Sequence, residues 1–338
     1  MTDIYNLSPE KLRNYLEEIG EKPSKADIIL PCLYKDFGKL SELPLKQSLI
    51  DRLKADFFAG GLTCEKKLES DTADKYLFKL SDGNFVETVL MKHEYGCNIC
   101  VSTQVGCNMG CAFCRSGRLK KVRNLTAAEI TEQMIYVIKE SGAEISGIAV
   151  MGIGEPLDNY EAVLDFIETA MYQKGFDIGP RHITLSTCGI VPKIYALSEG
   201  SYPINLAVSL HAPNNELRNK LMPINKKYPL SELMPAVKHY SEAKNRRITL
   251  EYVMLKGVND STEQAKQLSE LIGDSRCYVN IIRYNGSEND CFKCSDFDTI
   301  MRFYDVLKKN KIGVTMRREL GASVNAACGQ LRADYNKG

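Results

Sequence analysis

From residue 99 onward, the chain alternates short apolar segments with longer segments whose apolar residues recur at helical spacing. This alternation favours parallel strands joined by helical crossovers, in an open sheet or a closed barrel. The sequence therefore predicts an α/β fold for most of its 338 residues. The expected strands are 99–103, 145–151, 182–187, 204–210, 248–255, 278–283 and 313–316.

Helix starts are marked at two places. Ser8 and Pro9 suit the N-cap and the first position of a helix, and 45–58 has the pattern of a further helix near the N-terminus. Thr126 and Glu129 match a capping box, which predicts a well-defined helix from Thr126.

A β-hairpin is expected between the N-terminal helices and the α/β region. Strand-like segments at 76–80 and 85–91 flank 81–84, which contains an Asp-Gly turn. The predicted organisation is a small N-terminal helical accessory domain at 1–70, a β-hairpin extension at 71–98 and the α/β domain at 99–338.

Composition narrows the class of protein. Hydrophobic residues make up 44% and charged residues 26% of the chain, as in ordinary globular proteins. The first 20 residues are charged and lack the apolar stretch of a signal peptide, and no apolar run reaches the roughly 18 residues that span a bilayer. We therefore expect a cytoplasmic protein without a membrane partner. In a reducing compartment, twelve cysteines indicate metal binding or redox catalysis more often than disulfides.

Net charge neither favours nor excludes nucleic acid, because the formal value is +1. A local basic patch would have to carry such binding. The densest basic run is 118–123, and the pairs at 226–227, 246–247 and 317–318 are further candidates. Such runs are usually solvated surface, although one beside a functional motif could bind RNA phosphates.

Cys107, Cys111 and Cys114 form a CxxxCxxC motif directly after the first predicted α/β strand. Three thiolates suit three corners of a cubane iron–sulfur cluster and leave one iron open for the amino and carboxylate groups of S-adenosylmethionine (SAM). The alternatives are three loop cysteines, or a zinc site with a distant fourth ligand. The spacing and the strand-to-loop position are typical of radical SAM enzymes, so we predict a [4Fe–4S] cluster and SAM as cofactors.

A second motif fits the same cofactors. Gly152, Gly154, Glu155 and Pro156 follow the next predicted strand and resemble the GGEP segment of radical SAM enzymes, which meets the SAM ammonium group. Glycine permits close approach of the backbone. We therefore predict that Gly154 and Glu155 bind SAM.

From residue 85 to the C-terminus, the sequence resembles the RlmN/Cfr family of radical SAM adenosine methyltransferases, and the match is weaker before that, chiefly GEKP at 20–23. The resemblance implies a partial (β/α)6 radical SAM barrel. The matching stretches follow the family's order and spacing: VETV at 86–89, CVSTQ at 100–104, the cysteine motif, RNLT at 123–126, MGIGEP at 151–156, STCGI at 186–190, SLHA at 209–212 and ACGQL at 327–331.

The resemblance implies a two-cysteine mechanism. One SAM would methylate Cys328, and a second SAM would give the radical that takes hydrogen from the S-methyl group. The resulting carbon radical would add to an adenine carbon and Cys100 would remove the proton from it. Loss of one electron and closure of a Cys100–Cys328 disulfide would then release the product. Glu87 would act as an acid/base or positioning group. Without the resemblance, Cys328 would be interpreted as a buried small hydrophobic residue and Cys100 as an ordinary strand residue. Glu87 would be interpreted as a surface charge.

The resemblance also assigns contacts to SAM. Ser186 and Ser209 would lie at its ribose, and His211 and Asn285 near its adenosine moiety. The alternative is that these are merely polar residues at strand ends, although such ends line the site of parallel α/β folds.

The implied substrate is 23S rRNA, with tRNA as a further candidate, and the N-terminal helices would contact RNA. The enzyme would act as a monomer with an electron donor such as flavodoxin or ferredoxin. Glu155, Pro156 and 186–190 resemble the branch that modifies adenine C2, which we favour, whereas 282–285 looks more like the C8, antibiotic-resistance branch.

Three departures leave the target open. Residues 322–325 lack the family's acidic residues, Lys120 stands where a glycine is usual, and Gly286 replaces a proline. A diverged radical SAM enzyme acting on another RNA or a peptide therefore remains an alternative, as does a non-enzymatic iron–sulfur or zinc RNA-binding protein. Four further cysteines, in the pairs 97/100 and 291/294, could imitate a zinc site, but we favour no extra metal.

Overall fold

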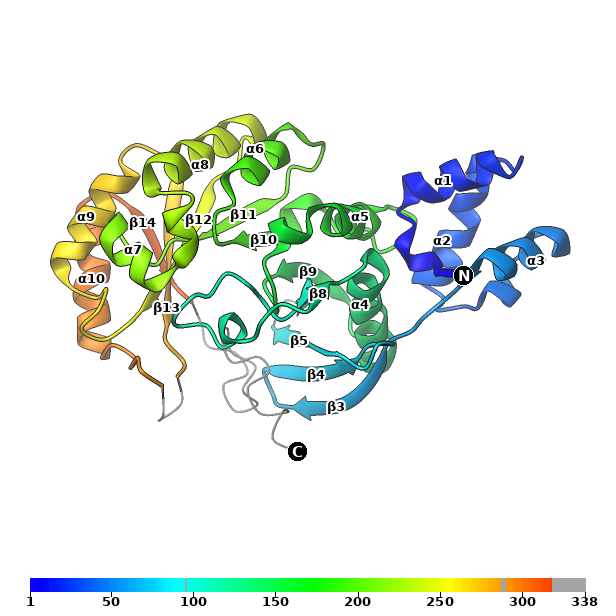
Figure 1. Cartoon of the computed structure of the whole chain (residues 1–338), viewed down its shortest axis with the longest axis horizontal. Coiled ribbons are helices and arrows are strands. Elements are labelled where there is room, and N and C mark those ends of the chain that lie inside the picture. Colours follow the sequence, from blue (N-terminus) through cyan, green and yellow to red (C-terminus); the bar gives the residue numbers. More distant parts are fainter. Residues whose placement is uncertain (95, 287–289, 318–338) are drawn as a thin grey trace.

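The computed structural model describes residues 1–94, 96–286 and 290–317, and within them a ten-stranded mixed sheet forms the centre of the molecule (Figure 1). Seven neighbouring strands from β6 to β14 run parallel, and β3, β4 and β5 extend the β6 edge in antiparallel fashion. In sheet order the strands are β14 (Gly313–Met316), β13 (Cys277–Arg283), β12 (Ile248–Met254), β11 (Asn205–Ser209), β10 (Ile183–Thr187), β9 (Ile145–Val150), β6 (Gly96–Cys100), β5 (Phe85–His93), β4 (Ala73–Lys79) and β3 (Thr63–Glu69).

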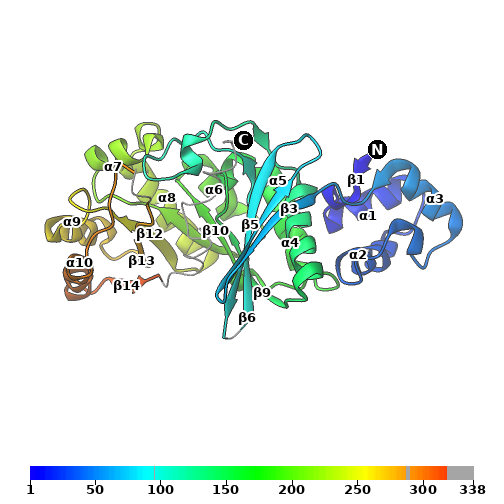
Figure 2. The same cartoon turned by 90° about the horizontal axis from the view of Figure 1, so that it is seen from below.

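Helices connect each parallel strand to the next and cover the outer face of the curved sheet (Figures 1 and 2). There are six such crossovers among the described residues, so the predicted partial (β/α)6 barrel is confirmed. The helices are α4 (Ala127–Ser141), α5 (Tyr160–Met171), α6 (Val191–Glu199), α7 (Asn215–Leu221) followed by α8 (Leu230–Lys244), α9 (Thr262–Ile272) and α10 (Phe297–Lys309).

The seven predicted strands of this region match the observed strands, with boundaries that differ by up to three residues. The largest difference is in the first, where β6 ends at Cys100 because the chain turns away and residues 104–105 (β7, Gln104–Val105) pair instead with β8 (Arg123–Asn124). β12 is buried along its whole length, as expected for a parallel strand covered on both faces.

The N-terminal residues form a separate apolar cluster around α1 (Pro9–Glu18), α2 (Ala26–Tyr34) and α3 (Gln47–Asp56). Ser8 caps α1 as predicted, through a hydrogen bond from the Lys11 amide to its hydroxyl. A two-residue parallel pair, β1 (Thr2–Asp3) and β2 (Phe57–Phe58), joins the two ends of this segment. Figure 1 shows these helices at one end of the molecule, beside α4 and α5.

The predicted hairpin is confirmed by the pairing of β4 with β5 around the turn at 81–84. Gly83 has a φ of 81°, which the turn requires, and the Leu80 amide donates to the Asn84 carbonyl at 2.8 Å. β3 was not predicted, because this largely exposed edge strand is rich in lysine and glutamate and lacks an apolar run. No helix in the described residues has the length and apolar character needed to cross a membrane.

Candidate active site

The three motif cysteines lie on the loop between β7 and β8, beyond the carboxyl end of β6. Gly106 allows this loop to close, because its φ is 76° and a Cβ there would lie 2.2 Å from the Lys120 carbonyl oxygen. The Cys107 amide donates to the Leu119 carbonyl at 3.0 Å, and the Ala112 amide donates to the Leu221 carbonyl at 2.9 Å. The loop is therefore fixed both to itself and to the end of α7.

Electrostatics indicates what these thiols can hold. Burial raises the pKa of Cys107 to about 11 and raises that of Cys111 further, and the neighbouring motif thiols add to both shifts. Thiolates are disfavoured at such a place unless a cationic group binds them, which fits the iron of a cluster. Among the described residues, no three Cys, His, Asp or Glu side chains, the motif cysteines included, are grouped as they would be around one metal ion.

The four residues predicted to contact the SAM nucleoside are brought together. Ser186, Ser209, His211 and Asn285 lie at or beyond the carboxyl ends of three strands, and all line one cavity of 140 Å³. Cys114 lines the same cavity, so the cluster loop and the predicted nucleoside contacts share one space. The parallel topology explains this, because residues at the carboxyl ends of parallel strands meet at one edge of the sheet.

His211 is a buried, neutral hydrogen-bond acceptor. Its φ is 56°, and its Nδ1 accepts the Val253 backbone N–H at 3.0 Å. Burial lowers its pKa to about 3, so the ring stays uncharged at neutral pH. Its ring meets Phe113 of the cluster loop edge-to-face, with centroids 4.6 Å apart.

Gly154 and Glu155 occupy the turn after β9, but they are not among the residues that line the small cavity. Gly154 has a φ of 111°, and a Cβ there would come within 2.6 Å of the Gln104 side chain. The Glu155 carboxylate accepts hydrogen bonds from the Leu157 amide, the Thr187 hydroxyl and the Cys188 amide at 2.7–3.0 Å. In this structure it therefore fastens the turn to the end of β10.

A fully buried arginine supports this turn from the other side. Arg218 of α7 donates to the carbonyl oxygens of Leu210, Cys188 and Ser209 and to Asn225 Oδ1, at 2.8–3.2 Å. Burial lowers its pKa to about 10, so it remains charged at neutral pH. Sequence reasoning missed Arg218, because a charged residue on a short helix is ordinarily exposed.

Cys100 and Glu87 lie on neighbouring strands. Cys100 is paired with Val89 in the sheet, is 8% exposed and packs in a cluster with Met151. Glu87 is two residues from Val89 on the same face of β5, is buried and forms an ion pair with Lys75 at 3.3 Å. Cys328 lies outside the described residues, so its relation to Cys100 stays a prediction.

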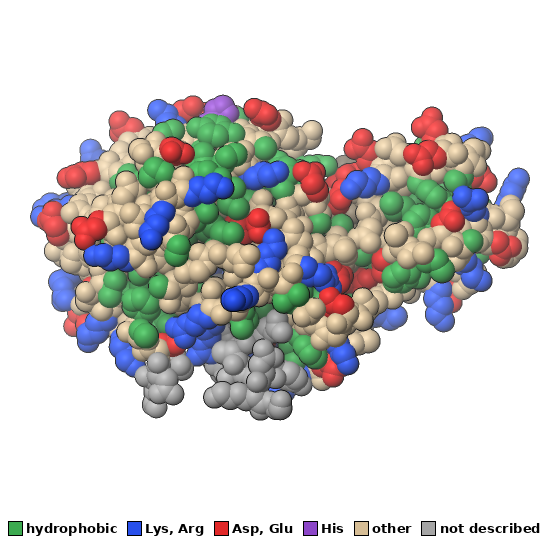
Figure 3. Space-filling model, in the orientation of Figure 1, with side chains coloured by type: hydrophobic (Ala, Val, Ile, Leu, Met, Phe, Trp, Pro, Cys, Tyr) green, Lys and Arg blue, Asp and Glu red, His purple; other side chains and the backbone are tan. Residues whose placement is uncertain are grey.

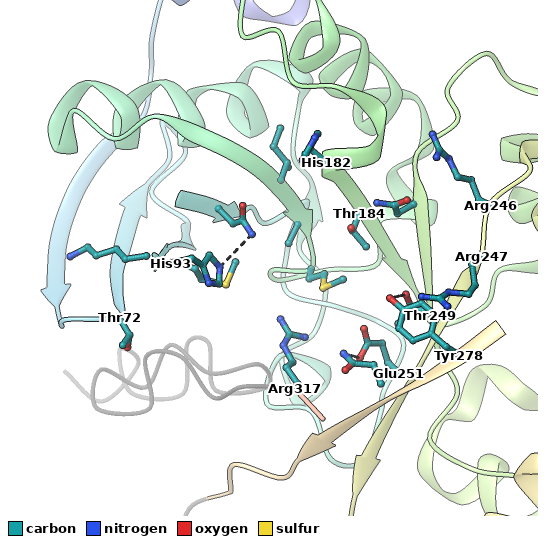
Figure 4. Close-up of a pocket in the computed structure, with 18 of the residues that line it drawn as sticks. Thr72, His93, His182, Thr184, Arg246, Arg247, Thr249, Glu251, Tyr278 and Arg317 are labelled. Atoms are coloured by element: carbon teal, nitrogen blue, oxygen red, sulfur yellow. Dashed lines mark hydrogen bonds between the residues drawn. The ribbon is translucent and has the colours of Figure 1, made fainter. Parts of the chain in front are cut away.

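A much larger cavity, of 1260 Å³, opens at the amino ends of the barrel strands (Figure 4). Among its labelled lining residues, the exposed His182 and Arg247 and the half-buried Arg246 lie at the rim, whereas Glu251 is buried. Met151, Glu251 and Arg317 line both this cavity and the small one, so these three side chains lie where the two cavities adjoin.

Most of the positive charge of the basic run at 118–123 is paired with carboxylates of the protein. Arg118 pairs with Asp290 at 3.0 Å, Lys121 with Asp158 at 2.7 Å, and Arg123 binds the Glu129 carboxylate with two bonds of 2.7 Å. Three of its cations therefore join segments of the protein to one another.

The barrel, the cysteine loop and the cavity at the strand ends together define a radical SAM enzyme. In agreement, the family model for the Radical SAM superfamily matches residues 101–268. SAM and an iron–sulfur cluster are the cofactors that this class uses, and the residues above fit them.

Relatives identify the family. A Listeria welshimeri protein named "Probable dual-specificity RNA methyltransferase RlmN" is 47% identical over 99% of this chain and 95% of its own length. The protein of that name from Acholeplasma laidlawii is 46% identical over 98% of both chains. The crystal structure of a radical SAM methyltransferase from Sphaerobacter thermophilus superimposes with a TM-score of 0.92, at 36% identity, over 99% of this chain and 100% of that one. This chain belongs to the RlmN family of radical SAM methyltransferases.

Proposed function

We propose that this protein methylates adenosine in RNA, at carbon C2, with 23S rRNA as its main substrate and tRNA as its second. It would use a [4Fe–4S] cluster, two SAM molecules per turnover and a methylated cysteine. The term "dual-specificity RNA methyltransferase" in the relatives' name supports two kinds of RNA substrate. The observation that carries the proposal is the adjoining pair of cavities: one holds the predicted SAM contacts and Cys114, and the other is large enough for a nucleotide.

The residues of the cofactor site have separable tasks. Cys107, Cys111 and Cys114 would ligate three irons, and the cluster, when bound, supplies the electron that cleaves SAM. Ser186 and Ser209 would hold the ribose. His211 would present its free ring edge to the nucleoside, while its Nδ1 stays engaged by the Val253 amide.

Cys100 is proposed as the thiol that takes the proton from the substituted adenine carbon. Its packing with Met151 supports this, because Met151 lines both cavities. After loss of one electron from the adduct, Cys100 would form a disulfide with Cys328 as the bond between the Cys328 sulfur and the transferred carbon breaks. Glu87, two positions from Val89 on the same strand face, would position the adenine or exchange a proton with it.

The surroundings follow from the same proposal. The N-terminal helices of domain 1–70 would contact RNA, the hairpin of 71–98 would carry Glu87, and the barrel of 99–338 would hold both cofactors. The protein would work in the cytoplasm as a monomer, with a flavodoxin or ferredoxin as its electron donor.

Product analysis tests the proposal. The anaerobically reconstituted protein is incubated with SAM, a reductant and 23S rRNA or tRNA fragments, and nucleosides are analysed by mass spectrometry. We expect 2-methyladenosine from both RNAs. Formation of 8-methyladenosine would correct the target carbon, and SAM cleavage without either product would overturn the proposed substrate. Zinc without iron or sulfide in the reconstituted protein would refute the enzyme assignment.

A trapped adduct tests the two-cysteine route. Cys100→Ala should accumulate a covalent protein–RNA complex through Cys328, because the proton that must leave has no acceptor. Cys277→Ala is the matched control, since this thiol is also 8% exposed and lies on a strand of the same sheet. A normal turnover of Cys100→Ala without an adduct would contradict the route.

A further inference from the structure

Glu251 is a carboxylate buried in the interior of the barrel. It lies on β12, opposite Ser209 of β11 and Asn280 of β13, and is 5% exposed. It is one of the three residues that line both cavities. A group that reaches from the large cavity toward the SAM contacts therefore comes close to this side chain, which Figure 4 shows on the lining of the large cavity.

One side of the carboxylate is held in place. Asn280 Nδ2 donates to Glu251 Oε2 at 2.9 Å, and the Thr315 hydroxyl donates to Asn280 Oδ1 at 3.1 Å, which fixes the direction of the amide. In the described part of the chain, this is the one hydrogen bond that the Glu251 carboxylate receives. No hydrogen bond to its Oε1 is found among the described residues, and the side chain lines both cavities, so this oxygen is available to a ligand.

Two effects act on the charge of Glu251. Burial is the larger effect and raises its pKa, whereas the positive charge of Arg317 and the hydrogen bond from Asn280 oppose that rise in part. Arg317 lines both cavities together with Glu251, so a cation lies near the carboxylate at the place where the cavities adjoin. The cation and the amide therefore both favour the ionised form, which is the form that accepts hydrogen bonds at both oxygens.

The chemistry of the open oxygen favours an N–H donor. A carboxylate oxygen attracts the exocyclic amine of adenine and repels the carbonyl oxygen that a 6-oxopurine has at that position. The rim of the same cavity suits a nucleotide strand. Arg246 and Arg247 precede β12, and the Arg247 guanidinium lies over the Tyr278 ring, 4.5 Å from its centroid, which forms a flat cationic surface.

We propose that Glu251, oriented by Asn280, determines specificity for adenine by accepting a hydrogen bond from the exocyclic amino group of the target base. This inference rests on the proposed function. It concerns which base is accepted, and it adds no chemical step to the methyl transfer. Glu251 is thus a specificity residue, and Asn280 is a positioning residue.

The test compares three RNA fragments that differ only at the target base: adenosine, purine riboside, which lacks the amine, and inosine, which carries an oxygen there. For the wild type, kcat/KM for adenosine should exceed that for purine riboside about tenfold to a hundredfold, with inosine poorer still. Glu251→Gln keeps the shape and should reduce the ratio of adenosine to inosine at least tenfold, because an amide can also donate to the oxygen. Glu270→Gln, on the exposed face of α9, should keep the wild-type ratios.

Three outcomes overturn the inference. Unchanged base ratios in Glu251→Gln would show that another group reads the amine. A weakened affinity for SAM, measured without RNA, with unchanged ratios would place Glu251 in the SAM site.

If Glu251→Gln does not fold, as judged by circular dichroism, Asn280→Ala serves instead. It should lower the adenosine-to-purine ratio while SAM affinity is kept, and an unchanged ratio would refute the proposal. A wild type that methylates none of the three RNAs refutes the proposed function itself.

Discussion

At the residue scale, the site is held by buried polar side chains that are engaged by oriented partners. Arg218 donates a hydrogen bond to the Cys188 carbonyl oxygen, and Glu155 accepts one from the Cys188 backbone N–H. Together they fix the turn beyond β10, beside the cavity that contains Ser186. Burial raises the pKa of Glu155 and lowers that of Arg218, and both polar side chains are tolerated in the interior because each is surrounded by oriented donors or acceptors.

Arg218→Met should destabilise the protein strongly. It leaves three carbonyl oxygens and Asn225 without their donor, which we expect to cost about 3–5 kcal/mol. Thermal unfolding followed by circular dichroism would measure the loss. Arg218→Lys should recover part of it, since an ammonium group can satisfy some of these acceptors. Lys220→Met, on the exposed side of the same helix, is the control and should change stability by less than about 0.5 kcal/mol. Equal melting temperatures for Arg218→Met and this control would contradict the assigned role.

At the element scale, α4 connects the N-terminal segment to the barrel. Glu132 of α4 accepts the backbone N–H groups of Gly61 and Leu62 at 2.8 Å and lies beside Asp3 of β1. Burial, and then the hydrogen bond with Asp3, raise the pKa of Glu132 from 4.5 to about 8. The two carboxyl groups can share this site because one of them carries a proton.

This pair should make stability fall as pH rises from about 5 to 8. In that window the folded protein holds a proton that the unfolded chain has lost, so unfolding releases it and becomes more favourable at higher pH. Each unit by which folding raises the pKa of Glu132 lowers the free energy of unfolding by about 1.4 kcal/mol over this pH window. Glu132→Gln should flatten the dependence of the unfolding free energy on pH, because an amide does not titrate in this range, and it can still accept from Gly61 and donate to Asp3.

The control for this prediction is Glu140→Gln, at the other end of α4. Lys67 lowers the pKa of Glu140, so this substitution should leave the slope between pH 5 and 8 as in the wild type. If Glu132→Gln keeps the wild-type slope, the pair of Glu132 and Asp3 is not the cause of the pH dependence of stability.

At the scale of the whole molecule, charge is spread rather than concentrated. Acidic and basic side chains are interspersed over the face seen in Figure 3, in keeping with a net charge of +1. Many of the basic side chains form ion pairs with carboxylates of the protein, as in the 118–123 run. RNA binding must therefore depend on a limited set of cations, and Arg246 and Arg247 at the rim of the large cavity are positioned for it.

The double variant Arg246→Ala with Arg247→Ala should weaken RNA binding and reduce its dependence on salt. Removing one cation that binds a phosphate lowers the slope of log affinity against log salt by about one. Filter binding at several salt concentrations measures this, and SAM affinity should be unchanged. Lys238→Ala, exposed on α8 away from the cavity, should leave the slope as it is. A double variant with the wild-type slope would mean that RNA approaches elsewhere.

Local sequence patterns determined much of this protein. The alternation of apolar segments predicted the barrel, the Asp-Gly turn predicted the hairpin, and the capping residues Thr126 and Glu129 marked the start of α4. The cysteine spacing predicted the cofactors. These features depend on residues close together in the chain, where backbone geometry and side-chain periodicity act directly.

Only the tertiary structure decided which of the remaining side chains act together. Ser186, Ser209, His211 and Asn285 share one cavity because segments of the barrel that are far apart in the chain end at the same edge. Arg118 meets Asp290 across 172 positions of sequence, and neither residue shows in the sequence that it has a partner. Glu251 could be seen as a polar residue within an apolar strand, but its place between two cavities follows from strand pairing. Burial and charge pairing depend on neighbours brought together by folding, and local sequence periodicity does not specify those neighbours.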